Sequence, residues 1–390
     1  MLQKYIKKIF TPKQSLNTKT RPLDFTTGFH HQESTVGIGS YKQNVIVYRC
    51  VNLVAQTASH VPWQIFTIKG GKRQIQPFHP VAKLLKTPSA NKGGAEFFAE
   101  LVSSKLLFGD AYILASGMDK APPKELYLLA SQNTNIVIEN GRAVAYKYHS
   151  HSGEKLFPIN PITRMSRVLH VKNYNPVNPF NGLSCLDAAA ASIEVHNMAS
   201  RWNAGLLRNG ARPSGALVVK EGSGYLSDEQ FERIREQLND KYVGSASAGR
   251  PMILEGGLDW REMSISPKDM DFVESKNAAA REIALAFGVP PQLLGINGDN
   301  TYSNMQEARL ALWEETLIPL LDKLSDSMTN WLSHLFGEEI IVEFDRDAIS
   351  ALTAKRDSLW DKIASSDFMS VNEKRAWLGM APIKGGDGVV

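Results

Sequence analysis

Few residues of the 390-residue sequence have the types and spacing that metal binding or catalysis requires. The densest candidate is the segment HSHSGE, from His149 to Glu154, because imidazole and carboxylate groups are common metal ligands. A metal site in a protein needs three or four such ligands, and no others at a matching spacing follow this segment. We therefore expect an exposed turn here and predict that the protein carries no metal and no cofactor.

A short loop segment and a single histidine also have side chains that could bind a metal ion or transfer a proton. Asn297, Asp299 and Asn300 are spaced like the first ligands of a calcium-binding loop, but the glutamate that closes such a loop is missing. His170 alternates with apolar residues in the segment VLHV, which indicates a strand and favours a hydrogen-bonded structural histidine. Neither group predicts a catalytic centre.

The two cysteines, Cys50 and Cys185, are too few for a disulfide framework or a structural zinc site. We expect both to be buried free thiols in a reducing compartment. A nucleophilic role for Cys185 would need a histidine partner, and the sequence indicates none.

The sequence also lacks the motifs of several enzyme classes. It has no GxxxxGK[ST] phosphate loop, no HExxH zinc motif, no GxSxG nucleophile turn and no GxGxxG dinucleotide motif after a strand. Its acidic residues are scattered along the chain and do not group into the set of carboxylates that a two-metal nuclease needs. We therefore predict that the protein is not an enzyme. A DNA-processing enzyme, such as a nuclease or a recombinase, is the alternative from another functional class.

Charge and hydropathy give only mild indications. The formal net charge is +4 and the pI is near 8.8, which a solvated surface explains as well as nucleic-acid binding does. Residues 1–40 are basic and typical of a flexible N-terminal arm. No apolar run reaches the ~18 residues that a membrane-spanning helix needs, so we predict no membrane partner.

The first half of the chain, residues 41–184, is predicted to form a mixed α+β domain. Apolar spacing predicts one helix over residues 41–59 and another over 95–107. Between them the sequence is typical of a hairpin that turns at Gly70-Gly71. Further strands follow, with a tight turn predicted at Asn140-Gly141.

A different organisation is predicted from residue 185 onward. Apolar periodicity predicts a helix over residues 185–210, with Ser184 as its N-terminal cap, and a second helix over 266–288. The intervening residues 211–265 have the pattern of a strand, a helix and further strands. The two helices would therefore form a stalk that carries a small folded unit.

The second stalk helix is expected to stop at Gly288-Val289-Pro290-Pro291, because glycine and proline end helices. A loop rich in glycine and asparagine follows over residues 289–304, and Ser303 with Gln306 has the spacing of a capping box. A long helix and then a strand are predicted over residues 305–345, with a kink at Pro319.

The long helix should carry a continuous apolar seam. The residues of this seam are Leu310, Trp313, Leu317, Leu321, Leu324, Met328, Trp331 and Leu335. The remaining residues 346–390 are predicted to form two short helices and a loose tail, with Ser370 and Glu373 capping the second helix.

Several segments, taken in order, resemble the portal proteins of tailed bacteriophages with an HK97-type capsid. The resemblance extends from about Val45 to Gly386. It rests on CVNLVAQTASHVPWQIF, HPVAKLLKTPSA, LLFGDAYIL, VLHVKNYNP with GLSCLDAA, LLRNGARPSGALVV, ILEGGLDWREMSISPKDMDF, REIALAFGVPPQLLG, TYSNMQEARLALWEETLIPLL and SVNEKRAWLGMAP. The most specific block combines GVPP, LLG and TYSN, whereas Cys185 departs from the proline that often follows GLS in this family.

The resemblance implies a portal-type α+β fold that assembles with identical copies into a ring, normally a homododecamer, at one vertex of the capsid. Double-stranded DNA would enter through this channel during packaging and leave through it during ejection. The family parts would be the wing (41–184 and the strand before residue 345), the stem (185–210 and 266–288), the clip (211–265), the tunnel loop (289–304), the long kinked helix (305–345), and the crown with the C-terminal tail (346–390).

The resemblance also implies partners and a location. A terminase large subunit would supply the packaging energy, a head–tail adaptor would dock later, and the ring would contact the major capsid protein and the scaffold. The protein would lie at the portal vertex of the virion, and in the host cytoplasm during assembly. A capsid-associated adaptor without a channel is a second alternative, and the stalk with its inserted unit favours the portal.

Two sets of site residues follow from these correspondences. The tunnel loop contains no lysine or arginine and one aspartate, so it would hold DNA phosphates weakly and let the duplex slide. A plain surface loop would suit the same composition. The predicted channel residues are Gln292, Leu293, Leu294, Ile296, Asn297, Asp299 and Asn300. The predicted docking residues, on the charged helix SDEQFERIREQLNDKY, are Glu229, Glu232, Arg233 and Glu236.

Overall fold

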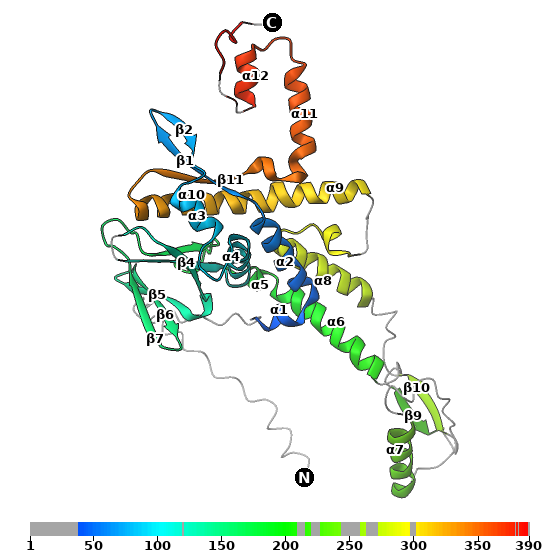
Figure 1. The fold of residues 1–390 in the computed structure, drawn as a ribbon. Coiled ribbons are helices and arrows are strands. Elements are labelled where there is room, and N and C mark those ends of the chain that lie inside the picture. The colour runs from blue at the N-terminus through cyan, green and yellow to red at the C-terminus, as the bar shows by residue number, and fades with distance from the viewer. Residues whose placement is uncertain are drawn as a thin grey trace, which may run out of the picture.

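The computed structural model of the chain describes residues 38–118, 121–208, 215–219, 227–242, 258–262, 272–296, 302–378, 380 and 382–388. It is a mixed α and β structure in which three antiparallel sheets and several helices form a body, and two groups of elements extend from that body in different directions (Figure 1). Residues 1–37 of the predicted basic arm (1–40) are not among the described residues.

The body begins with two helices where a single one was predicted. Helix α1 (Gly39–Gln43) and helix α2 (Val45–Ser59) are separated by Asn44, which has an extended backbone. The Asn44 side chain accepts hydrogen bonds from the N–H groups of Ile46 and Val47, so it starts a new helix in place of continuing the first. Helix α2 then packs along α4 (Gly94–Phe108), whose bounds extend one residue beyond the predicted helix at each end.

The strands of the body form three antiparallel sheets. Their orders are β11-β1-β2, β4-β3-β8 and β5-β6-β7. The strands are β1 (Trp63–Lys69), β2 (Lys72–Ile75), β3 (Asp110–Ser116), β4 (Glu125–Leu129), β5 (Thr134–Glu139), β6 (Arg142–Ser150), β7 (Gly153–Pro158), β8 (Val168–Lys172) and β11 (Ile340–Phe344). The predicted hairpin turns are confirmed, and Asn140 and Gly141 both have positive φ, as a tight two-residue turn requires. A short helix, α3 (Pro80–Lys86), was not predicted.

The predicted stalk helices lie side by side and lead away from the body (Figure 1). They are α6 (Ala190–Arg208), preceded by the single turn α5 (Cys185–Ala188), and α8 (Phe272–Ala286). The predicted helix over 185–210 is therefore interrupted at Ala189, although Ser184 caps its start as expected. The predicted start of the second helix at residue 266 lies outside the described residues.

A small unit stands at the far end of the stalk (Figure 1). Strands β9 (Gly215–Val219) and β10 (Leu258–Glu262) pair in antiparallel fashion, and α7 (Asp228–Tyr242) lies beside them. The predicted strand over residues 251–257 lies outside the described part of the chain.

The long helix crosses the body as α9 (Tyr302–Ala311), six π-helical residues (Leu312–Leu317) and α10 (Ile318–Phe336). A kink was predicted at Pro319, and the structure has a π-helical stretch, Leu312–Leu317, just before this proline. Proline has no N–H to donate to the preceding turn, and wider π-helical hydrogen bonding is one way to accommodate it.

The predicted apolar seam is confirmed as core between residues 317 and 331, whereas Leu310, Trp313 and Leu335 are half-buried. Leu317, Leu321, Leu324, Met328 and Trp331 are all buried in the cluster that includes α2 and α4. Strand β11, which follows this helix, pairs with β1, so the late part of the sequence completes the sheet begun by the early part.

The C-terminal helices α11 (Thr353–Ala364) and α12 (Val371–Trp377) extend from the body on a different side from the stalk (Figure 1). The capping box of Ser370 and Glu373 is confirmed, since each side chain bonds the backbone N–H of the other residue.

Candidate functional site

The site of greatest interest is the point where α8 ends and the predicted tunnel loop begins. Gly288 has a left-handed backbone (φ 65°), and its N–H donates to the Leu285 carbonyl at 3.0 Å. The next N–H, that of Val289, donates to the Ala284 carbonyl at 2.9 Å, and the Val289 side chain is buried. These two bonds satisfy two carbonyls of the last helical turn, and Pro290-Pro291 then prevents its continuation. The predicted stop is therefore confirmed.

The first residues of the loop form a regular turn that packs against the body. Pro291–Leu294 make one turn of 3-10 helix, which ends at Gly295 with φ 72°. Leu293 and Leu294 pack against the core cluster, and Ile296 is only 8% exposed. In the single chain these three apolar side chains therefore anchor the loop, and their contact with DNA stays a prediction.

The remaining predicted channel residues are placed as follows. Gln292 is half-buried in the same 3-10 turn. Asn297, Asp299 and Asn300 lie outside the described residues, so their role also stays a prediction.

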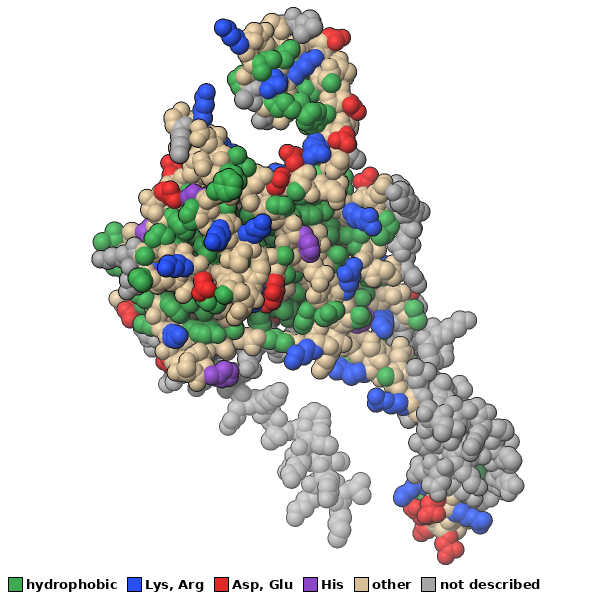
Figure 2. All heavy atoms as spheres, viewed as in Figure 1, with side chains coloured by type: hydrophobic (Ala, Val, Ile, Leu, Met, Phe, Trp, Pro, Cys, Tyr) green, Lys and Arg blue, Asp and Glu red, His purple; other side chains and the backbone are tan. Residues whose placement is uncertain are grey.

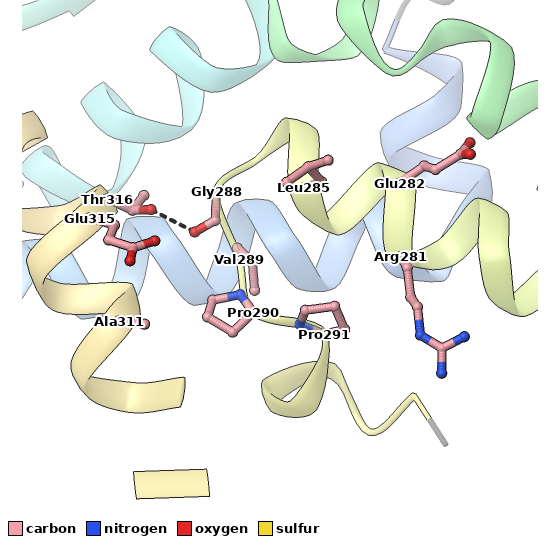
Figure 3. A pocket seen from close by; sticks show the side chains of 10 residues that line it. All are labelled: Arg281, Glu282, Leu285, Gly288, Val289, Pro290, Pro291, Ala311, Glu315 and Thr316. Atoms are coloured by element: carbon pink, nitrogen blue, oxygen red, sulfur yellow. Dashed lines mark hydrogen bonds between the residues drawn. The ribbon is translucent and has the colours of Figure 1, made fainter. Parts of the chain in front are cut away.

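A hydrogen bond ties the start of this loop to the long helix. The hydroxyl of Thr316, in the π-helical stretch, donates to the Gly288 carbonyl at 2.6 Å (Figure 3). The Thr316 side chain lies so close to Gly288 that a β-carbon on Gly288 would be 2.5 Å from the Thr316 Oγ1 atom. Any change in the direction of the loop is thus coupled to the geometry of the long helix.

A hollow of about 510 Å³ lies beside this junction (Figure 3). Its apolar lining comes from Leu285, Val289, Pro290, Pro291 and Ala311. Charged side chains of Arg281, Glu282 and Glu315 also line it. An apolar lining with a few charged side chains is a composition that suits contact with a polypeptide.

The metal candidate of the sequence is confirmed as an exposed turn. His149 contacts Glu154 at 3.2 Å between Nδ1 and Oε1 across the β6–β7 hairpin, and both side chains are exposed to solvent. Lys147, hydrogen-bonded to Glu154, lowers the pKa of that carboxyl. Within the described ranges, no group of three histidine, cysteine or acidic residues could hold a metal ion.

His170 has the structural role that was predicted. Its Nε2 atom lies 2.6 Å from Oδ1 of Asp110, a residue with no exposed surface, and its ring stacks on Tyr112 with centroids 4.4 Å apart. The same oxygen accepts the N–H of Gly182 at 2.8 Å, so Asp110 joins strand β8 to the segment that leads into the stalk. Sequence reasoning missed Asp110, because an aspartate at the start of a strand gives no local signal of such a bond.

The surroundings of Asp110 include a buried lysine. Burial, together with the nearby charge of Lys323, lowers the pKa of Lys105 to about 8. Its ammonium donates to the Asn173 side chain, in the same segment that Asp110 holds. This polar cluster fixes where the stalk leaves the body.

Both cysteines have thiol pKa values above the ordinary value. Burial raises the pKa of Cys50 to about 12, and burial also raises the pKa of Cys185 despite the nearby Lys105. Both thiols are free; Cys50 is fully buried as expected, whereas Cys185 is half-buried. A thiol with a raised pKa is a poor nucleophile, which argues against the catalytic role considered for Cys185.

The predicted docking residues share the surface of α7. Glu229, Glu232, Arg233 and Glu236 are all exposed, and Arg235 pairs with Glu232 at 3.1 Å. Figure 2 shows acidic and basic side chains together on this outer end of the unit. The geometry leaves the four side chains accessible, and docking through them stays a prediction.

Known proteins are similar to this chain in sequence over nearly all of its described residues. A sequence model of the phage portal protein family matches residues 45–379. An uncharacterized protein of Rickettsia felis is 56% identical and covers 99% of this chain and 100% of its own length. The portal protein of Enterobacteria phage HK97 is 25% identical, over 87% of this chain and 80% of the phage protein.

A solved structure, described as the neck of a native GTA particle computed with C12 symmetry, has a similar fold. It is 38% identical, covers 93% of this chain and 96% of its own, and superposes with a TM-score of 0.69. In the portion of this chain that the structure describes, no helix is long and apolar enough to cross a membrane. The family match, its extent and the shared fold together show that this chain belongs to the phage portal protein family.

Proposed function

We propose that the protein forms a ring of identical copies, normally a homododecamer, whose channel passes double-stranded DNA into a capsid and out of it. The observation that carries the proposal is the similarity, over 93% of the chain, to a protein in a particle neck computed with C12 symmetry. The architecture fits this role, because the α6–α8 pair holds a small unit well away from the body (Figure 1). The body would form the wing, and helices α11 and α12 would form part of the crown.

The proposed partners follow from the exposed ends of the molecule. The α7 unit would be the clip, where a terminase large subunit docks during packaging and a head–tail adaptor docks afterwards. The major capsid protein and a scaffold would contact the ring at the portal vertex. The chain itself would have no catalytic activity, and the terminase ATPase would supply the energy that a protein without a phosphate loop cannot.

The first test is the native mass of the purified protein. Light scattering after gel filtration, with negative-stain imaging of the peak, is expected to show a ring of about a dozen copies with a central hole. A stable monomer or dimer over a range of salt and protein concentrations would overturn the proposal and favour an adaptor without a channel.

The proposed tunnel loop gives a second prediction, because its weak hold on DNA depends on the absence of basic residues. Replacing Asn297 and Asn300 by lysine is expected to tighten the binding of linear double-stranded DNA to the ring. Each lysine that reaches a phosphate should add about 0.9 to the slope of log K against log salt. Fluorescence anisotropy over a salt series measures both quantities.

The control carries the same two added charges outside the proposed channel. Gln132 and Asn133 are exposed on the body, and lysine at both positions should leave the salt slope unchanged. Equal slopes for the loop variant and this control would mean that the loop does not meet DNA.

A further inference from the structure

A lysine amine and an asparagine side chain meet in the polar cluster at the base of the stalk. The Lys105 amine donates a hydrogen bond to Oδ1 of Asn173, and Lys105 is only 6% exposed. Burial, with the nearby charge of Lys323, lowers the pKa of this amine to about 8, although Cys185 and Asp110 act to raise it. A large share of these amines is therefore neutral at mildly alkaline pH, and a neutral amine has a lone pair that can act as a nucleophile.

The side-chain amide of Asn173 is held in one orientation beside this amine. Its Nδ2 donates to the Leu183 carbonyl at 3.0 Å and to the Lys105 carbonyl at 3.4 Å. The backbone N–H of Asn173 donates to the Gly109 carbonyl at 2.8 Å. These bonds fix the plane of the amide while its oxygen accepts from the amine. A carbonyl group held in this way next to a nucleophile is the arrangement that makes an intramolecular reaction fast.

A buried carboxylate with one unused oxygen belongs to the same cluster. Asp110 has no exposed surface, and its Oδ1 accepts from His170 and from the Gly182 N–H. Its Oδ2 is buried and has no hydrogen-bond partner among the described residues. Gly182 and Leu183 are adjacent, so one short piece of backbone positions both the carboxylate and the Asn173 amide. A free carboxylate oxygen in such a place can carry a proton between two nitrogen atoms.

We propose that Lys105 and Asn173 form a covalent isopeptide bond in the folded chain, with Asp110 as the proton carrier. The lone pair of Lys105 Nζ attacks Cγ of Asn173, and the Cγ–Nδ2 bond breaks. Asp110 Oδ2 takes a proton from Nζ and passes it to Nδ2, which leaves as ammonia. One amine and one primary amide thus give one secondary amide and one ammonia, and no other reactant is needed. The chain reacts once with itself and turns over no substrate.

The bond would join the body to the start of the stalk. Lys105 belongs to α4, and Asn173 begins the segment that leads from β8 to α5 and α6. After the reaction, a force on the stalk would reach the body through a covalent bond in place of hydrogen bonds. The reaction needs the folded geometry, so freshly folded protein starts unlinked. The inference does not depend on ring formation.

Peptide mass spectrometry detects this bond directly. Trypsin does not cleave after a lysine whose amine is acylated, so linked protein should give peptide 93–120 joined to peptide 173–201. The joined pair is lighter than the two peptides together by one ammonia. The peptide measurement is needed because succinimide formation at Asn140-Gly141 would also release ammonia from the intact chain.

The rate at which the joined peptide appears tests the mechanism. The full-length protein is incubated at about pH 9 and at about pH 7, on either side of the Lys105 pKa of about 8, and sampled over time. We expect the joined peptide to accumulate about tenfold faster at the higher pH, because the neutral fraction of the amine rises by about that factor. No joined peptide in the folded wild-type protein at either pH would overturn the inference.

Three matched samples complete the experiment. Lys105→Arg keeps the positive charge but lacks the amine, and it should give no joined peptide. Asp110→Asn keeps Oδ1 but cannot carry the proton, and it should slow the linkage at least about tenfold. Wild-type protein kept unfolded in urea should also remain unlinked. Equal rates in the wild-type and Asp110→Asn proteins, or linkage in urea, would contradict a reaction that Asp110 and the folded geometry promote.

Discussion

Replacing Asp110 by alanine is expected to lower the free energy of unfolding by about 2–5 kcal/mol, because it leaves two partly buried donors without an acceptor. These donors are the His170 ring nitrogen at 2.6 Å and the Gly182 N–H at 2.8 Å from the same carboxylate oxygen. Urea denaturation followed by circular dichroism measures the loss. The measurement should be made on protein diluted below ring assembly, so that subunit contacts do not contribute.

The matched control is Asp110→Asn, which keeps the oxygen that accepts both bonds. The second carboxylate oxygen, Oδ2, is buried and has no hydrogen-bond partner, so an amide nitrogen in its place breaks no existing bond. We expect the asparagine variant to lose about half as much stability as the alanine variant or less. Equal losses in the two variants would show that the negative charge, and not the hydrogen-bond geometry, holds this part of the structure together.

Replacing Gly288 by alanine is expected to cost about 2–4 kcal/mol of unfolding free energy. Part of the cost is the left-handed backbone, which an L-residue disfavours by about 1–2 kcal/mol. The rest is steric, because the new β-carbon would lie 2.5 Å from the Thr316 hydroxyl. Chemical denaturation measures the total, and the temperature at which rings dissociate shows whether the strain reaches the assembly.

Gly295 offers a control with the same backbone and no crowding. Its φ is 72°, and a β-carbon there would meet nothing within 4 Å, so Gly295→Ala should cost only the backbone part. In the background of Thr316→Ala, the cost of Gly288→Ala should fall toward that of Gly295→Ala, since the clashing atom is gone. Strictly additive effects of the two changes would mean that the Thr316 contact does not restrict the loop.

The strongest local signals of the sequence predicted elements that the structure contains. The hairpin at Asn140-Gly141, the helix end at Gly288 and the capping box at Ser370 each depend on residues within a few positions of one another. Local signals misplaced other boundaries. The apolar spacing continues through Asn44, and only the hydrogen bonds of its side chain show that one helix ends there and another begins.

Asn44 illustrates why such boundaries depend on tertiary contacts. Besides capping α2, its side-chain amide reaches His196, at 3.1 Å, and Asn197, at 2.9 Å, both on helix α6. Burial, together with the charge of Lys276, lowers the pKa of His196, and a neutral imidazole can accept this bond through Nδ1. A residue about 150 positions away in the sequence thus stabilises the break, and no short window of sequence contains that information.

Residue types at short spacing were enough to predict the order of most elements, the apolar seam of the long helix and the resemblance to portal proteins. The three-dimensional structure was needed to show that Leu293, Leu294 and Ile296 pack inward, that Asp110 holds the base of the stalk, and that Thr316 bonds Gly288. It also showed that the Val195 and Met198 side chains of α6 are 42% and 50% exposed. The physical reason is the same in each case, because burial and hydrogen bonding depend on which distant segments meet, whereas helix and turn signals act through neighbours along the chain.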